Sequence, residues 1–109
     1  MIAMDVPPVA AVGVGLREFE VAAYRPSVRA GAARFSVTNL GEDPHDLAIR
    51  AVRAPRRFLA ATAQIKPGGH GTLRVSLRPG RYELLCTIGD HAQRGMRTTI
   101  TVQAARRTA

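Results

Sequence analysis

Cysteine, lysine, aromatic residues and long apolar runs are all scarce in this chain. Cys86 is the only cysteine among the 109 residues, so no disulfide can form within the chain. No stretch approaches the roughly 20 apolar residues that a bilayer-spanning helix needs, and we therefore expect no transmembrane segment. Residues 1–15 have no basic start and are interrupted by Pro7 and Pro8, so they do not resemble a secretory signal peptide.

Arginine is the abundant residue that stands out. All of the 16 basic residues except Lys66 are arginine, and against 8 acidic residues they give a net charge of +8. A surface this basic attracts nucleic acid or anionic lipid without specificity. With 3 Phe, 2 Tyr and no Trp, however, the chain has too few aromatic residues for a base-stacking surface. We therefore expect no specific nucleic-acid binding, and we interpret most of the arginine surplus as a contribution to solubility.

The length and hydrophobicity of the chain predict a single domain. A hydrophobic content of 46% over 109 residues is sufficient to build one core. We therefore expect one domain over residues 1–109, with flexible ends at 1–13 and 104–109.

Strand patterns dominate the sequence. Polar and apolar residues alternate over 34–38, 72–77 and 98–102, as they do in strands that bury one face. Together with weaker runs and Gly/Pro turns, these segments predict an all-β sandwich of about 7–8 strands. Residues 56–65 are the exception, and there we expect a short helix or an irregular segment.

Candidate metal ligands gather between residues 86 and 96. Cys86, His91 and Met96 follow one another at intervals of five residues, between one strand and the next. His45 follows Pro44 at the start of an earlier strand, and it can reach this loop because strand ends of a sandwich meet at one pole. A lone cysteine is usually an inert core residue. Two imidazoles, one thiolate and a thioether, however, are the ligand set of a trigonal copper site with a long axial bond.

Further segments surround these residues in a recognisable pattern. They are Asn39-Leu40-Gly41, Pro44-His45-Asp46-Leu47, Lys66-Pro67-Gly68, and the run from Pro79-Gly80-Arg81-Tyr82 to Cys86. With the ligand set, they resemble the Asn-x-Gly and Pro-His segment, the Pro-Gly turn and the Gly-x-Tyr-x-x-x-Cys approach of the cupredoxins. This is the small blue-copper family that includes plastocyanin and azurin, and the similarity covers most of the chain.

The resemblance implies a Greek-key β-sandwich with a type 1 (blue) copper site. It implies His45, Cys86 and His91 as strong equatorial ligands and Met96 as the axial ligand of one copper ion per chain, which alternates between Cu(I) and Cu(II). Four protein ligands leave no open position for a substrate. We therefore expect an electron-transfer protein that shuttles single electrons, not an enzyme. The resemblance also implies a periplasmic or other extracytoplasmic location.

The expected partners are redox proteins that meet a monomeric carrier. The donor and the acceptor would be proteins such as a cytochrome or a copper oxidase or reductase, and a membrane-associated partner is compatible with the sequence. Arg94 and Arg97 flank the ligand loop and favour an acidic partner through electrostatic steering. A small apolar patch around His91 suits short-lived docking. We expect this patch to consist of Gly41, Pro44, Ala92 and Gly95.

Three further residues bear on the site or on its surroundings. Asp46 stands where many relatives have an asparagine that braces the ligand loops, and an aspartate can still accept a hydrogen bond from Thr87. Asp90 precedes His91, and a carboxylate beside a ligand imidazole would favour the oxidised metal and lower the reduction potential. His70 lies in a glycine-rich turn with no second ligand nearby, and we expect a solvated residue at the pole opposite the copper.

Other functions are compatible with the same residues. One is a copper carrier or delivery domain, and another is a cupredoxin module of a larger copper enzyme. A more distant alternative is a basic β-domain that binds an anionic polymer, in which Cys86 is purely structural.

Overall fold

The structure, a computed structural model, describes residues 9–105, and within this range it contains nine strands and no helix. None of these residues therefore forms a helix that could cross a membrane. The strands are β1 (Ala10–Arg17), β2 (Glu20–Ala23), β3 (Ser27–Arg29), β4 (Gly31–Asn39), β5 (Ala48–Ala51), β6 (Phe58–Ala61), β7 (His70–Leu77), β8 (Gly80–Leu85) and β9 (Arg97–Gln103).

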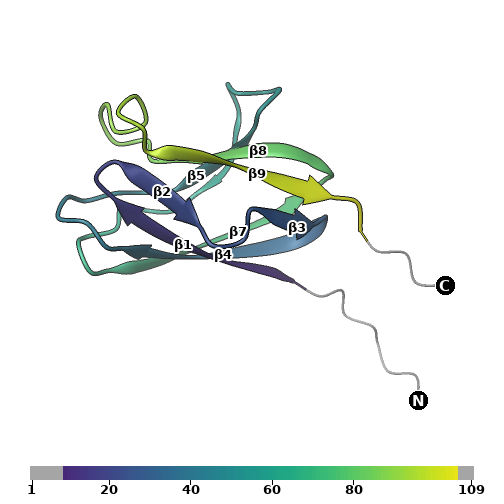
Figure 1. The fold of residues 1–109 in the computed structure, drawn as a ribbon, viewed down its shortest axis with the longest axis horizontal. Coiled ribbons are helices and arrows are strands. Elements are labelled where there is room, and N and C mark those ends of the chain that lie inside the picture. The colour runs from purple at the N-terminus through teal and green to yellow at the C-terminus, as the bar shows by residue number, and fades with distance from the viewer. Residues whose placement is uncertain (1–8, 106–109) are drawn as a thin grey trace, which may run out of the picture.

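The strands form two sheets that pack face to face (Figure 1). One sheet has four strands in the order β2-β1-β4-β7, and the other has five in the order β3-β9-β8-β5-β6. The predicted all-β Greek-key sandwich is confirmed. The described residues form nine strands instead of about 7–8, because residues 10–23 form the two strands of the β1–β2 hairpin and residues 58–61 form β6.

The core lies between the sheets and follows from the alternation along their strands. In β4, Ala33, Phe35 and Val37 are buried, whereas Arg34 and Ser36 between them face solvent. The facing sheet contributes apolar side chains in the same way. They include Ile49 of β5, Leu84 of β8, and Ile100 and Val102 of β9. One face of each sheet is therefore covered by the other.

The first strand begins within the N-terminal segment that the sequence predicted to be flexible. Residues 1–13 were expected to be flexible, but Ala10–Arg17 form β1, and Ala10 pairs in parallel with Ala33 of β4. The backbone hydrogen bonds of this parallel pair fix a segment whose composition carries no strong strand signal. Residues 1–8 and 106–109, which make up most of the ends predicted to be flexible, lie outside the described residues.

The segment 56–65 contains no helix, which corrects one of the two predicted alternatives. Phe58–Ala61 form the edge strand β6, which pairs antiparallel with β5 and has an irregular register between Ile49 and Arg50. Ile65 then forms an isolated bridge with His45. A helix this short gains few internal hydrogen bonds, whereas the open edge of β5 supplies a partner for the backbone.

The register between β5 and β8 positions the candidate ligands. Ala48 pairs with Leu85, so the loop before β5 and the loop after β8 leave the sheet at the same end. The tip of the β1–β2 hairpin lies at this end too, as Figure 1 shows. Three segments far apart in the sequence therefore meet at one pole of the sandwich, which we call the ligand pole.

We expect Phe35→Ala to destabilise the protein by about 3–5 kcal/mol, because the ring is 0% exposed at the centre of the core. Phe58→Ala is the matched control, since its ring is 46% exposed, and it should cost about 1 kcal/mol or less. Urea unfolding of the metal-free variants measures both changes. Similar losses for the two variants would contradict the assignment of the core.

Candidate metal centre

Three nitrogen and sulfur atoms converge at the ligand pole. His45 Nδ1 and His91 Nδ1 are 3.3 Å apart. Cys86 Sγ lies 3.9 Å from His45 Nδ1 and 3.6 Å from His91 Nδ1. No other trio of His, Cys, Asp or Glu side chains in the described residues brings its ligand atoms together in this way. The structure thus brings together His45, Cys86 and His91, three of the residues that the sequence singled out, from two different loops.

The triangle has the dimensions of a metal site. Bonds of about 2.0 Å to nitrogen and about 2.3 Å to sulfur, arranged trigonally, separate the two nitrogens by about 3.5 Å and each nitrogen from sulfur by about 3.7 Å. The three observed separations are 3.3, 3.6 and 3.9 Å. A single metal ion therefore fits between these atoms without movement of the loops.

His45 is held in place by backbone pairing and by a buried asparagine. Its N–H donates to the Ile65 carbonyl at 3.1 Å, and its carbonyl accepts the Ile65 N–H at 2.7 Å. The amide of Asn39, which is 0% exposed, donates to the carbonyls of Asp43 and Ile65, and its oxygen accepts the N–H of Gly41. These bonds close the β4–β5 loop and fix the backbone of His45.

The β8–β9 loop folds back so that its two ends meet. The N–H of Cys86 donates to the Met96 carbonyl at 3.1 Å, and the N–H of Met96 donates to the His91 carbonyl at 3.0 Å. Gly95 has a φ of 116°, a backbone conformation that residues with a side chain rarely adopt, and this conformation makes the turn before Met96. Met96 is fully buried beside the ligand triangle, so all four residues predicted as ligands lie at one place.

Asp46 ties the two ligand loops together. Its carboxylate accepts a hydrogen bond from the backbone N–H of Thr87 at 2.6 Å and another from the Thr87 hydroxyl. The acceptor role expected of this aspartate is thus present. Because Asp46 follows His45 and Thr87 follows Cys86, these bonds fix the two ligands relative to each other.

Burial separates His91 from the other three residues. His45, Cys86 and Met96 are each 0% exposed, whereas His91 is only partly buried. Burial raises the pKa of the Cys86 thiol, so the metal-free residue is a neutral thiol, and a bound metal must displace its proton. The site is therefore enclosed except at His91.

Glu18 contacts the site, although no sequence motif pointed to it. Its Oε1 lies 2.8 Å from Nε2 of His45, on the side of the ring opposite the ligand triangle. The backbone N–H groups of Asp43 and Glu42 also donate to this carboxylate. The bond from Asp43 is the main cause that lowers the pKa of Glu18 to about 2, with Glu42 and His45 contributing. Glu18 is therefore a carboxylate at any ordinary pH.

Phe19 is the second residue that the sequence did not reveal. Its ring centre is 5.1 Å from that of His91. Arg94 lies over the Phe19 ring, with its guanidinium carbon 5.0 Å from the ring centre, and its Nε is 2.9 Å from an oxygen of Asp90. The bond from Arg94 lowers the pKa of Asp90. Asp90, expected to act on His91 by its charge, is thus paired with a cation.

His70 is exposed, as expected, but its position differs from the expectation. It begins β7 opposite Thr38, and its Nδ1 lies 3.2 Å from the Thr38 hydroxyl. The next residue of β4 is Asn39, which braces the loop of His45. His70 therefore lies toward the ligand pole on the outer face of the sheet, and not at the opposite end.

Comparison with known proteins agrees with this geometry. A family model described as multicopper oxidase matches residues 28–106. The chain belongs to this family, and its fold is that of a cupredoxin. No curated protein matches the sequence.

Solved structures with the same fold include three auracyanins. Auracyanin B superposes with a TM-score of 0.76 at 20% identity, over 94% of both chains. The dithionite-reduced auracyanin from the photosynthetic bacterium Roseiflexus castenholzii gives 0.64 at 20% identity, covering 87% of this chain and 96% of the other. Auracyanin A, a "blue" copper protein from the green thermophilic photosynthetic bacterium Chloroflexus aurantiacus, gives 0.68 at 12% identity, covering 88% and 100%.

The donor set of this cupredoxin fits copper. One thiolate and two imidazoles in a triangle, with a thioether residue beside them, suit an ion that changes between a soft and a borderline state. A catalytic site would need an open coordination position. Here the surroundings are closed by the buried Leu47 and Leu84 and by the partly buried Ile88, which pack in the same core cluster as Cys86 and Met96.

We expect Asn39→Ala to lower the free energy of unfolding by about 1–3 kcal/mol, because it leaves buried backbone groups of the His45 loop without partners. Copper affinity should fall as well, since the loop that holds His45 loosens. Thr38→Ala, at the neighbouring, partly exposed position, is the control. Denaturant unfolding and a competitive copper titration measure the two effects. Equal behaviour of the two variants would refute this role of Asn39.

Proposed function

We propose that this protein is a one-electron carrier whose type 1 copper site is formed by His45, Cys86, His91 and Met96. The observation that carries the proposal is the preformed triangle of donor atoms, which is buried on every side except at His91. A bound copper ion supplies a one-electron couple at this position. The remaining tasks belong to the polypeptide.

The first task is to keep the ligand geometry constant. The bonds of Asn39, the Asp46–Thr87 contact and the Cys86–Met96 backbone bond hold the loops from independent directions. A ligand set that does not move imposes one compromise geometry on both oxidation states. Little reorganisation then accompanies the arrival or departure of an electron.

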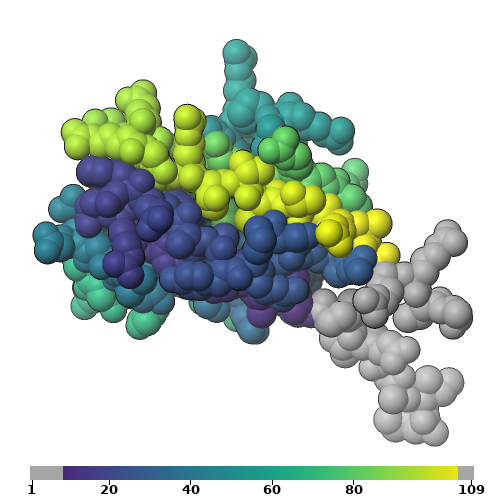
Figure 2. Space-filling view, in the orientation of Figure 1, coloured from purple at the N-terminus to yellow at the C-terminus, as the bar shows by residue number. Residues whose placement is uncertain are grey.

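The second task is to provide a route for the electron. His91 is the ligand that reaches the surface, where Ala92 lies beside it and Phe19 packs against its ring. Figure 2 shows the β8–β9 loop lying over the β1–β2 hairpin at this end of the molecule. We propose that partners dock on a small surface around His91, Phe19 and Ala92. Such surfaces suit interfaces below roughly 1,200 Å², which form and dissociate quickly.

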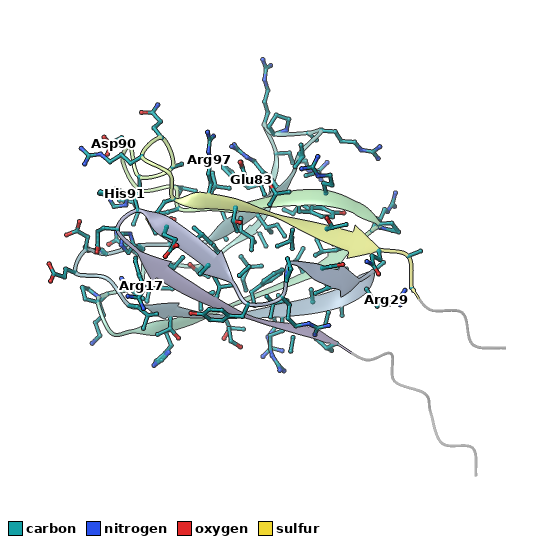
Figure 3. All side chains as sticks on the ribbon, viewed as in Figure 1. Arg17, Arg29, Glu83, Asp90, His91 and Arg97 are labelled. Atoms are coloured by element: carbon teal, nitrogen blue, oxygen red, sulfur yellow. The ribbon has the colours of Figure 1, made fainter. Side chains whose placement is uncertain are left out.

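The distribution of charge bears on the nature of the partner. Most of the 8 acidic residues lie at the ligand pole, in its turns and loops or, for Glu20, at the start of β2. They are Glu18, Glu20, Glu42, Asp43, Asp46 and Asp90. The excess of arginine therefore lies elsewhere on the surface, and Figure 3 shows, for example, Arg29 at the far end. Arg94 is paired with Asp90, which leaves Arg97 of the two arginines expected to steer an acidic partner.

A second candidate function is that of a module in a larger copper enzyme. The observation that favours it is the description of the matching family as multicopper oxidase. In that case His91 would pass electrons to another copper centre of the same assembly and not to a separate protein. Electron self-exchange between separate chains is the result that would favour the carrier.

The location and the assembly state extend the proposal. We propose an extracytoplasmic protein, as the family implies, that acts as a single domain and as a monomer. Support for the monomer comes from Cys86, which is fully buried and so does not provide a thiol for a disulfide-linked pair.

We expect the metal-free protein to take up one Cu(II) per chain and to develop the intense visible absorption of a copper–thiolate bond. Cys86→Ser should abolish this absorption, because no other thiol exists in the chain. His70→Ala is the control and should behave as the wild type. Optical titration measures the result. Labile, colourless binding would instead support copper carriage, and no binding would refute the copper site.

We expect Ala92→Glu to slow electron self-exchange between oxidised and reduced protein by at least about tenfold, because two like charges then meet at the docking surface. The copper spectrum should remain unchanged. Ala32→Glu is the control, since it adds the same charge at an exposed position near the other end of the sandwich. NMR line broadening measures the exchange rate. Equal slowing in both variants would contradict docking at His91.

A further inference from the structure

We propose that Glu18 is a positioning residue of the metal centre that fixes the tautomer of His45 and favours the oxidised metal. The inference rests on the proposed function, because it concerns the same site. Its observable consequences are a lower reduction potential than the site would have without Glu18 and a single tautomer of the His45 ring.

The position of Glu18 determines which nitrogen of His45 faces the ligand triangle. Nε2 lies 2.8 Å from the carboxylate, while Nδ1 lies 3.3 Å from His91 Nδ1 and 3.9 Å from Cys86 Sγ. A neutral imidazole carries one N–H, and a carboxylate can only accept a hydrogen bond. The proton is therefore on Nε2, and the lone pair of Nδ1 points toward the triangle.

The carboxylate cannot turn away easily from this arrangement. The N–H of Asp43 donates to it at 2.7 Å and the N–H of Glu42 at 2.9 Å, so three donors from one loop hold it. Gly41 has no side chain, and this leaves the space that the Glu18 carboxylate occupies. A Cβ at Gly41 would lie 2.5 Å from Glu18 Oε1, which is closer than such contacts occur. The loop is thus shaped around the carboxylate.

The charge of Glu18 acts on the site without an opposing cation. Within residues 9–105, His45 is the only basic side chain within ion-pair distance of Glu18. Asp90 differs in this respect, because Arg94 is bonded to it. A negative charge beside a ligand imidazole makes the ring a stronger donor and stabilises the more positive oxidation state. The effect first expected of Asp90 is therefore assigned to Glu18.

The main test replaces the charge with an amide of nearly equal size. Removal of such a partner of a metal ligand costs about 10–100-fold in metal affinity. We expect Glu18→Gln to weaken Cu(II) binding by this amount and Cu(I) binding less, so that the reduction potential rises. For a one-electron couple, a tenfold difference between the two affinities corresponds to about 59 mV.

Glu20→Gln is the matched control. It removes the same charge from the same hairpin, at an exposed residue for which no contact with His45 is found. Redox titration of the two variants and the wild type separates the bonded carboxylate from the general field of the protein. A Glu18→Gln potential equal to that of Glu20→Gln would overturn the proposal.

A second measurement keeps the inference separate from the proposed function. ¹⁵N NMR of the metal-free protein reports which nitrogen of His45 carries the proton. We expect the Nε2–H form in the wild type and a mixture of tautomers in Glu18→Gln. The same mixture in the wild type would refute the role of Glu18, even if copper binds. A clear Nε2–H form without copper uptake would refute the proposed function alone.

If Glu18→Gln fails to fold, Glu18→Asp keeps the charge but shortens the side chain. The comparison is then with Glu20→Asp. Weaker Cu(II) binding by Glu18→Asp supports the direct contact, and equal binding by the two variants overturns it.

Discussion

The metal centre depends on the register between β5 and β8. Pairing of Ala48 with Leu85 sets His45, three residues before the first, near Cys86, one residue after the second. Side chains of a strand alternate between its two faces, so a slip of one residue would turn Cys86 away from its partners. The Asp46–Thr87 contact continues the same pairing past the end of the regular ladder. Everything else at the ligand pole is built on this alignment.

The sequence was sufficient to predict the sandwich and to single out the four residues that meet at the ligand pole, and for physical reasons. Segments such as 34–38 and 72–77 pack one face against the core and turn the other toward solvent, so their alternation is strict. The ligands are rare residue types at regular spacing, which makes their pattern specific. β6 could not be predicted, because its side chains are mostly exposed at the sheet edge and carry no alternation.

Glu18 and Phe19 also escaped prediction, for a different reason. Their importance comes from the place where a hairpin tip folds, opposite loops that are more than 20 residues away in sequence. Glutamate and phenylalanine are common residues, and nothing in their neighbours marks them. The net charge of +8 was a poor guide to the surface around the metal centre for a comparable reason. A sum over the whole chain does not show where on the surface the charges lie. The strongly basic character belongs mainly to surfaces away from the metal centre.

The tip of the β1–β2 hairpin touches both imidazoles through two adjacent residues. Glu18 contacts the inner ring of His45, and Phe19 contacts the outer ring of His91. Neither residue belongs to the loops that supply metal ligands. The electronic character of the buried ring and the shape of the surface around the exposed one are thus encoded outside the ligand loops. Substitutions in this hairpin can therefore change the redox properties of such a scaffold while the metal-binding residues stay constant.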